Sequence, residues 1–365
     1  MSSTIASIFQ RIENKPLPVA QSSACVTFSQ AESFFHLAAA KNSRAETLRA
    51  HFAKVGFGKV FLSGNINGFG CQIPGCKVQY LEKGFFMETD DAMRAQQRAM
   101  LQDAVVIVNN NDVGQGQAQY GDFFSQCEKT IFVAWDWDNH HWLDLSTFLA
   151  AHSDIYAPGH HENLYLLTRY NWATVGPVYC STVQWTREFL ADSLPMLISA
   201  ERSSDPLGKH IPYGPFTFRN RVVSTLSQTY PSIGFSDRTF HVRTPQERLQ
   251  EWAAHKAHWI VPVLNDIPIR IFDALITGGI PIVPESMRYL PLVRDIDREH
   301  IVFCTPHDIM DPQAVVNQAN ALFDTHGRDG LVARHRLALD HHHGDQRMQQ
   351  IMAFVREKFA ATVQG

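Results

Sequence analysis

The sequence lacks the excess of basic residues that a nucleic-acid-binding protein usually carries. Lys and Arg number 32 against 36 Asp and Glu, which gives a formal net charge of −4. Binding to a phosphate backbone is driven mainly by Lys and Arg. We therefore expect no nucleic-acid partner.

Long apolar runs are also missing. The run 130–135 (TIFVAW) is far shorter than the ~20 residues that span a bilayer. Residues 1–15 show no basic segment followed by an apolar one, because Arg11 and Glu13 interrupt it. We expect a soluble, cytoplasmic protein without a transmembrane segment, and peripheral membrane contact stays open.

Cysteine is scarce, with six in 365 residues, so no disulfide framework is expected. Cys71 and Cys76 lie five apart without a second pair, which favours free thiols over a metal site. Apolar residues make up 45% of the chain, enough for a large core and against global disorder. At about 150 residues per domain, the length predicts two domains.

Short apolar runs alternate with helical patterns along both halves of the chain. This alternation predicts an α/β protein with parallel sheets and helices on both faces. We expect strands at 24–29, 59–63, 76–81, 103–109, 130–134, 154–157, 194–199, 232–235, 259–264, 280–283 and 301–304. We expect helices at 30–55, 90–102, 185–190, 219–230, 244–257, 268–277, 313–323 and 331–361, a loop at 201–214, and a domain junction between 175 and 195.

The stretch 259–285 (WIVPVLNDIPIRIFDALITGGIPIVPE) is the most informative part of the sequence. It predicts a strand, a short loop, a helix that Gly278 and Gly279 end, and another strand. Ligands bind beyond the carboxyl ends of strands in open parallel sheets, where Asn265 and Asp266 are expected. Arg270 and Asp273 are three apart and share a helix face, as a surface ion pair or as part of a site.

This stretch resembles the donor-binding domain of GT-B glycosyltransferases. That family shows a P-x-R-x-F-[ED]-A-L-x-x-G-G-x-P-[IV] run on the helix that holds the nucleotide sugar. The matching residues are Pro268, Arg270, Phe272, Asp273, Ala274, Leu275, Gly278, Gly279, Pro281 and Ile282. In the family the carboxylate at the position of Asp273 commonly binds the ribose. Many retaining members carry two Glu eight positions apart, where this sequence has Asn265 and Asp273.

The resemblance implies two Rossmann-like domains that face a cleft. Residues 1–180 would bind the acceptor, a glycan, a lipid-linked molecule or a protein, and residues 195–340 the nucleotide-sugar donor. Residues 341–365 would form a C-terminal helix that can cross back to the first domain. The implied activity is sugar transfer to a hydroxyl in bacterial surface glycan or glycoconjugate synthesis. The donor-binding candidates are Arg202, Lys209, Arg219, Asn265, Asp266, Arg270 and Asp273.

No Asp-x-Asp motif follows a strand of the second half, so we expect no metal and no cofactor, with cations at the diphosphate instead. Titratable side chains follow two strands of the first half, in WDWDNHHW (135–142) and GHHE (159–162). They could supply the base that deprotonates the acceptor hydroxyl. The candidates are Asp136, Asp138, His140, His141, His160 and His161.

Two other functions stay open. The same side chains, with Glu162, could hold a metal ion in a metal-dependent hydrolase. A non-catalytic sugar-binding protein is the third possibility, although such receptors usually need an export signal. The triple His at 341–343 is expected on a solvated face of the C-terminal helix.

Overall fold

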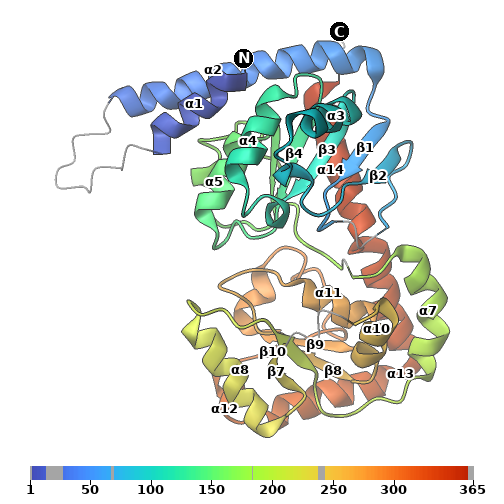
Figure 1. The fold of residues 1–365 in the computed structure, drawn as a ribbon. Helices are drawn as coiled ribbons and strands as arrows, with labels where there is room; N and C mark the ends of the chain where they lie inside the picture. The colour runs from blue at the N-terminus through green and yellow to red at the C-terminus, as the bar shows by residue number, and fades with distance from the viewer. Residues whose placement is uncertain (1, 14–27, 67–69, 183, 237–242, 361–365) are drawn as a thin grey trace, which may run out of the picture. The chain divides into compact units, whose positions relative to one another are not determined.

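A computed structural model describes residues 2–13, 28–66, 70–182, 184–236 and 243–360. The chain forms two compact units (Figure 1). The first unit comprises Met1–Asn67, Cys71–Tyr179 and Arg347–Gly365, and the second comprises Gly68–Gly70 and Cys180–Gln346. The unit boundary between Tyr179 and Cys180 falls inside the junction proposed from the sequence.

The first unit contains a five-stranded parallel sheet with the order β2-β1-β3-β4-β5. Its strands are β1 (Lys59–Leu62), β2 (Lys77–Tyr80), β3 (Val105–Asn109), β4 (Ile131–Asp136) and β5 (Ile155–Pro158). Every residue of β3, β4 and the edge strand β5 is buried, as expected for a parallel sheet covered on both faces. These five strands confirm the predicted ones from residue 59 onward.

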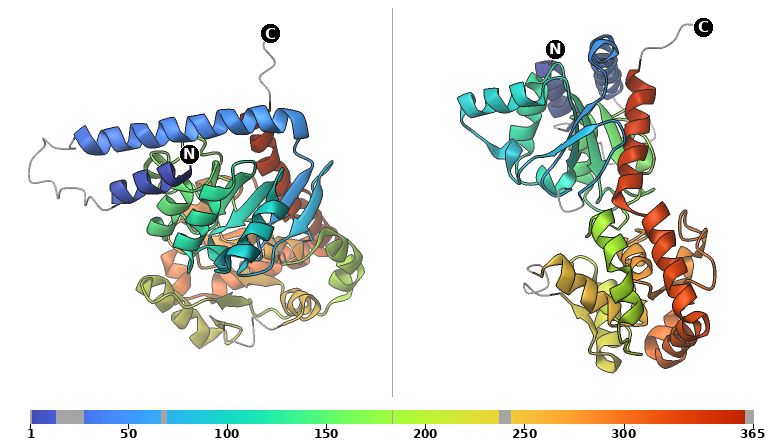
Figure 2. Two further views of the ribbon diagram at one scale, coloured as in Figure 1. Left: turned by 45° about the horizontal axis from the view of Figure 1, so that its top comes forward. Right: turned by 90° about the vertical axis from the view of Figure 1, so that its right-hand side faces the viewer.

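The helices of the first unit follow the α/β alternation. They are α1 (Ser2–Glu13), α2 (Phe28–Val55), α3 (Asp91–Leu101), α4 (Gln117–Gln126), α5 (Leu143–Ala151), α6 (Leu164–Leu167) and most of α14 (Gly344–Phe359), with short 3-10 turns η2 (Phe85–Met87) and η3 (Asn110–Asp112). In both views of Figure 2, α14 runs alongside the sheet of this unit. Of the strand predicted at 24–29, residues 24–27 lie outside the described residues. Phe28 and Ser29 belong to α2, so that part of the prediction is wrong.

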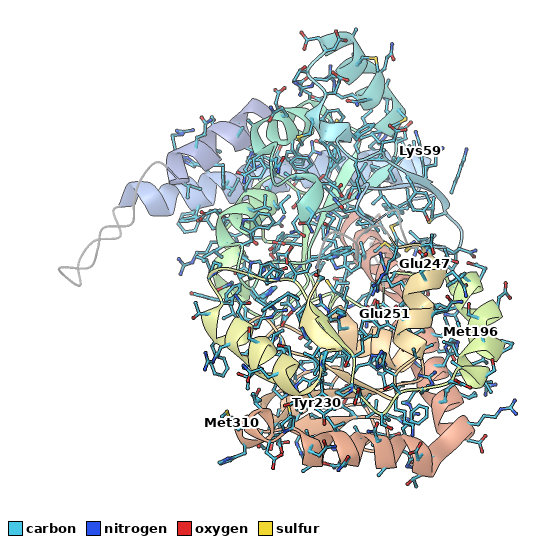
Figure 3. All side chains as sticks on the ribbon, turned by 60° about the horizontal axis from the view of Figure 1, so that its bottom comes forward. Lys59, Met196, Tyr230, Glu247, Glu251 and Met310 are labelled. Atoms are coloured by element: carbon cyan, nitrogen blue, oxygen red, sulfur yellow. The ribbon has the colours of Figure 1, made fainter. Side chains whose placement is uncertain are left out.

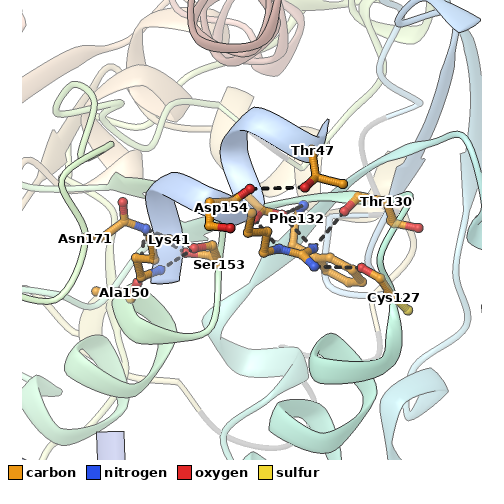
Figure 4. A network of polar contacts seen from close by, with 11 residues as sticks. Lys41, Thr47, Cys127, Thr130, Phe132, Ala150, Ser153, Asp154 and Asn171 are labelled. Atoms are coloured by element: carbon orange, nitrogen blue, oxygen red, sulfur yellow. Dashed lines mark hydrogen bonds and ion pairs between the residues drawn. The ribbon is translucent and has the colours of Figure 1, made fainter. Parts of the chain in front are cut away.

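Two basic side chains fasten α2 to the amino-terminal edge of this sheet (Figure 4). Arg44 forms an ion pair with Asp154 through Nε and Nη2, at 2.6 and 3.1 Å. It also donates to the carbonyl oxygens of Cys127 and Thr130, at 2.9 and 3.0 Å. One guanidinium therefore joins the segments that precede β4 and β5.

Lys41, one turn earlier on α2, donates to the carbonyl oxygens of Ala150 and Ser153 at 3.0 and 2.7 Å (Figure 4). Asn171 Nδ2 donates to the same two oxygens, at 3.0 and 3.1 Å. Burial lowers the pKa of Lys41 to about 7, against a smaller opposing effect of Asp154. The end of α5 is thus held by two donors from different parts of the chain.

The second unit is also α/β, and its strands are all parallel to their neighbours. They are β6 (Gly208–His210), β7 (Ile233–Phe235), β8 (Ala257–Trp259), β9 (Ile280–Pro284) and β10 (Val302–Cys304), in the groups β6-β7 and β10-β9-β8. Leu207 bridges the groups, because its N–H donates to Ala257 O at 3.0 Å and its oxygen accepts from Trp259 N at 2.8 Å. The resulting order is β7-β6-β8-β9-β10, so both units are compatible with a Rossmann-like fold.

The helices of the second unit are α7 (Arg187–Ser199), α8 (Thr217–Thr229), α10 (Pro245–Ala253), α11 (Ile269–Ile276), α12 (Pro306–Met310) and α13 (Gln313–His341), with the 3-10 turn η4 (Glu285–Tyr289). The predicted cap of α10 is confirmed. Thr244 Oγ1 accepts from Glu247 N, and Glu247 Oε2 accepts from Thr244 N at 2.8 Å. Figure 3 labels Glu247 on this helix, one turn before Glu251.

Four sequence predictions for this unit are corrected. The strand predicted at 259–264 lies at Ala257–Trp259 instead, and the two ranges share only Trp259. Residues 194–199 continue α7 rather than forming a strand, because Leu190, Ser193 and Leu197 recur at helical spacing and are buried together. The predicted loop 201–214 contains β6. The helix predicted at 331–361 is interrupted between His341 and Gly344. In the described part of the chain, no helix is both long and apolar enough to cross a membrane.

Candidate functional site

Polar side chains gather at the carboxyl edge of the first unit's sheet, after β4 and β5. The two strands are neighbours, with Asp136 paired to Pro158 in register. The loop 137–141 after β4 therefore lies beside the loop 159–162 after β5. This adjacency brings together candidates that stand about twenty positions apart in the sequence.

Asp136, the last residue of β4, is fully buried. Its Oδ2 accepts from the Tyr156 hydroxyl at 2.6 Å, and its Oδ1 accepts from Asp138 N at 3.1 Å. Burial raises the pKa of Asp136 to about 6, although the hydrogen bond from Tyr156 opposes the shift. This carboxyl supports the loop after β4, and no substrate hydroxyl reaches it in this conformation.

Asp138 is partly accessible, with 22% of its side chain exposed. Its Oδ2 accepts from Asn110 Nδ2 at 2.6 Å, and its Oδ1 lies 3.5 Å from His141 Nε2. Burial acts to raise the pKa of Asp138, but the hydrogen bonds from His141 and Asn110 outweigh it and lower the pKa. Asp138 is therefore an ionised carboxylate at neutral pH, paired with an imidazole.

His140 and His160 are buried imidazoles in ring contact, with centroids 4.3 Å apart. The His141 ring lies 4.4 Å from His140 on another side. Burial, reinforced by the neighbouring imidazoles, lowers the pKa of His140 to about 2, and burial lowers that of His160 to about 4. Both are neutral at physiological pH. Among the described residues, neither ring nitrogen of His140 has a hydrogen-bond partner.

Asn139 fastens the two loops together. Its Nδ2 donates to the carbonyl oxygens of His160 and Glu162 at 3.0 and 2.8 Å, and its Oδ1 accepts from His160 N at 2.8 Å. Asn163 Nδ2 donates back to Asn139 O at 2.8 Å. In the loop after β5, His161 Nδ1 lies 3.7 Å from Glu162 Oε2.

No role for Asn139 or Asn110 is predicted from the sequence. Asn110 Oδ1 accepts from Trp137 N at 2.9 Å while its Nδ2 holds Asp138. The run of Asn at the end of the strand 103–109 could have indicated a polar contact here, but ordinary loops have the same composition. These amides hold the candidate base in place by binding the backbone around it.

The second unit carries a cavity of about 520 Å³ at the carboxyl ends of β8, β9 and β10. The lining includes aromatic and apolar side chains from α8 and β8, with the turns after β9 and β10 on the other side. Representative lining residues are Phe216, Phe218, Trp259, Pro262, Glu285 and Thr305. The cavity can take a flat, mostly apolar group such as an aromatic ring system.

Arg219, in the first turn of α8, lines the same cavity. Its Nη1 donates to Ile211 O at 2.7 Å and its Nε to Val261 O at 3.3 Å, and its guanidinium lies over the Tyr213 ring. Burial lowers the pKa of Arg219, and the positive charge of Arg270 lowers it further. The protein therefore holds two cations close together here.

Arg270 lies in the first turn of α11 and is half-buried. Its guanidinium makes no hydrogen bond and no ion pair with the described residues. Burial lowers the pKa of Arg270, and the charges of Asp273 and Asp266 oppose that shift. Asp266 Oδ1 accepts from Val263 N at 2.6 Å and thereby closes the loop before α11. Arg270 thus has free donors beside the amino end of a helix.

Asp273 is fully buried on α11. Its Oδ2 accepts from Gln184 Nε2, and Gln184 Oε1 accepts from Arg248 Nη1 at 2.9 Å. Burial raises the pKa of Asp273 to about 6, while the hydrogen bond from Gln184 and the charge of Arg270 partly offset it. The contact between Gln184 and Arg248 could not be predicted from the sequence, because the two residues are 64 positions apart.

His210 ends β6 and belongs to this site, although no sequence pattern indicated it. Its Nε2 accepts from Val261 N at 3.1 Å, so its Nδ1 carries the proton that faces Gly208 O at 3.2 Å. Burial lowers the pKa of His210 well below its usual range, so the ring is neutral. It joins β6 to the segment after β8, next to Arg219.

The remaining donor candidates do not line the cavity. Arg202 donates to the carbonyl oxygens of His255 and Thr277, at 3.0 and 2.7 Å, and of Leu197. His255 precedes β8 and Thr277 precedes β9, which places Arg202 at the amino edge of the sheet, opposite the cavity. Asn265 is exposed in the loop after β8, and Lys209 is half-buried within β6.

The prediction that the triple His lies on a solvated helix face holds for His341, which is exposed, and is wrong for His342 and His343. His341 ends α13, whereas His342 and His343 lie between α13 and α14 and are buried. The His342 ring stacks on Phe272 at 4.4 Å, and His343 Nε2 lies 3.0 Å from Trp185 O. Because the helix is broken here, the rings of His342 and His343 are buried in the core.

No protein-family model matches this chain, and no curated protein is significantly similar to it.

Proposed function

We propose that the protein is a GT-B-type glycosyltransferase, in which two Rossmann-like domains face a cleft. It would transfer a sugar from a nucleotide-sugar donor, bound by the second unit, to a hydroxyl of an acceptor bound by the first. The acceptor is a glycan, a lipid-linked molecule or a protein, and the process is surface glycan or glycoconjugate synthesis.

The main support is that Arg219 lines the cavity of the second unit and that Arg270 lies close enough to Arg219 to affect its pKa. A nucleoside diphosphate combines an aromatic base with about two negative charges on its phosphates. The cavity suits the base. Arg270 has no ion-pair partner among the described residues, and together with the amino end of α11 it supplies donors for phosphate oxygens. Asp273, on the same helix, would bind a ribose hydroxyl in place of Gln184, and because it is fully buried here this contact requires the Gln184 side chain to move away.

The proposed reaction needs one base and one charged leaving group. Asp138, held by Asn110 and His141, would accept the proton of the acceptor hydroxyl. The acceptor oxygen then forms a bond to the anomeric carbon as the bond from that carbon to the phosphate oxygen breaks. Arg219 and Arg270 would stabilise the negative charge that the diphosphate gains. This scheme needs no metal ion.

Nucleotide titration of two matched variants tests the proposal. Titration calorimetry with UDP, GDP, CDP and dTDP should identify one that binds. Arg270→Met should weaken that binding about 10- to 100-fold, as expected for the loss of charged hydrogen bonds worth about 1.5–3 kcal/mol. Arg221→Met is the control, because Arg221 is exposed on α8 two residues from Arg219. Failure of all four nucleotides to bind, or wild-type affinity in Arg270→Met, would contradict the proposal.

A metal-dependent hydrolase is the second candidate, and one observation favours it. Ligand atoms of Asp138, His140 and His141 lie within 4.8 Å of one another. Carboxylate and neutral imidazole are ligands that Zn²⁺ accepts. Elemental analysis of the purified protein distinguishes the candidates. One stoichiometric metal ion, lost in the double variant Asp138→Ala/His140→Ala, would favour the hydrolase.

A further inference from the structure

Two arginines, one fully buried and one half-buried, meet at the amino edge of the second unit's sheet, opposite the proposed donor site. Arg334 of α13 is 0% exposed, and Arg202 lies between α7 and β6. Arg202 Nη2 donates to Thr277 O at 2.7 Å, and Arg334 Nε donates to the oxygen of the next residue, Gly278, at 2.9 Å. Both guanidiniums lie 5.3 Å from the centroid of the Phe323 ring. The two positive charges are therefore held close together.

Several donors of this pair have no acceptor. Arg334 Nη1 and Nη2 and Arg202 Nε are buried and make no hydrogen bond with any described residue. Within the described ranges, neither arginine forms an ion pair with a carboxylate. The charge of Glu299 acts to raise the pKa of Arg334, but the Glu299 carboxylate pairs with histidines instead. Its Oε2 lies 3.7 Å from His326 Nδ1, and its Oε1 lies 3.9 Å from His300 Nε2. Each unsatisfied buried donor costs about 1–3 kcal/mol, so native proteins almost always provide a partner.

The electrostatics of the pair favour a negatively charged partner. Burial lowers the pKa of both Arg202 and Arg334 to about 10, and the charge of Arg202 adds to the lowering at Arg334. Both groups nevertheless remain cations at neutral pH. A water molecule would satisfy one or two donors but would leave the repulsion between the cations.

We propose that a small inorganic anion, of the size and charge of chloride, binds between Arg334 and Arg202. The unsatisfied N–H groups would donate to it, and its charge would offset the repulsion. The size follows from the burial, because Arg334 has no exposed surface through which a larger ligand could extend into solvent. Both arginines hold the turn where α11 ends and β9 begins, so the anion would stabilise the segment that carries Arg270 and Asp273.

Thermal unfolding in chloride and in gluconate at constant ionic strength tests this site. An increase from 0 to 200 mM chloride should raise the Tm of the native protein by about 2–4 °C, because an ion that binds the folded state stabilises it. Arg334→Met should lose this response. Arg336→Met, at an exposed position on the same helix, should keep it.

A second measurement uses the native protein alone, so it remains decisive if Arg334→Met does not fold. Crystals soaked in bromide should show an anomalous peak within about 3.5 Å of the Arg334 Nη atoms. Absence of bromide there would overturn the proposal. An equal response to chloride in the native protein and in a folded Arg334→Met would also overturn it, because the stabilising ion would then bind elsewhere.

Discussion

Replacing Asp273 by Asn should stabilise the protein above pH 6 while it weakens nucleotide binding. The Asp273 carboxyl is fully buried, and its pKa is raised from 3.8 to about 6, chiefly by burial. Asn is nearly isosteric, and its oxygen can still accept the hydrogen bond from Gln184 Nε2. The substitution therefore removes a buried charge and keeps the packing.

The magnitude follows from the pKa difference. The folded state binds the Asp273 proton more tightly than the unfolded state does. The wild-type protein therefore loses stability as the pH rises from 3.8 to 6, and the loss is complete above that range. About two pKa units correspond to about 3 kcal/mol. The stability advantage of Asp273→Asn should thus grow from below about 1 kcal/mol at pH 4 to about 3 kcal/mol at pH 8.

Urea unfolding of both proteins at pH 4, 6 and 8 measures this difference. The comparison cancels the titration of all groups that the two proteins share. Asp329→Asn is the control, since Asp329 is exposed on α13 and surface substitutions usually change stability by less than 0.5 kcal/mol. An advantage that does not change with pH would refute the argument from burial. Increased stability without weaker nucleotide binding would refute only the proposed ribose contact.

Two further predictions concern the first unit. Asp138→Asn should lower turnover of the nucleotide sugar by about 10²-fold at unchanged nucleotide affinity, because it removes the proposed base. Asp136→Asn should keep most of the turnover, and kinetics that show an equal loss in both variants would contradict the assignment. Burial lowers the pKa of Lys41 to about 7, so Lys41 loses its proton at a lower pH in the folded state than in the unfolded state. Stability should therefore rise by about 2 kcal/mol between pH 7 and 9. Urea unfolding should show that Lys41→Met abolishes this rise in stability. The control Lys54→Met, at an exposed position of α2, should keep the rise. If the rise persists in Lys41→Met, another group causes it.

Hydrophobic periodicity predicted most strands and helices because each depends on local pattern. It failed at 194–199, where a short apolar run fits a strand or a buried helix equally well. Leu, Met and Ile around Pro195 continue α7, and only the burial of Leu190 and Leu197 on one side distinguishes the two. The break after His341 was missed for the same reason, since the residues on both sides of it are helical.

The sequence also indicated where polar side chains would gather, because the carboxyl ends of parallel strands share an edge. It could not indicate which contacts hold them. Asn139 binds backbone atoms more than twenty residues away, and no local pattern reports such a pairing. Arg202 is a second residue whose contacts could not be predicted from the sequence. Its position before β6 did not reveal that its side chain reaches carbonyl oxygens at the amino edge.

The path of the chain has a consequence for synthesis on the ribosome. Residues from Arg347 onward belong to the first unit, although all of 180–346 belongs to the second. Met348, Ile351, Met352 and Val355 of α14 are fully buried, so the first unit lacks part of its interior until they arrive. Domains usually fold in the order in which they emerge, the N-terminal one first. Here the unit that begins to emerge first is the last to be completed, and its unfinished apolar surface stays exposed while the whole second unit is made.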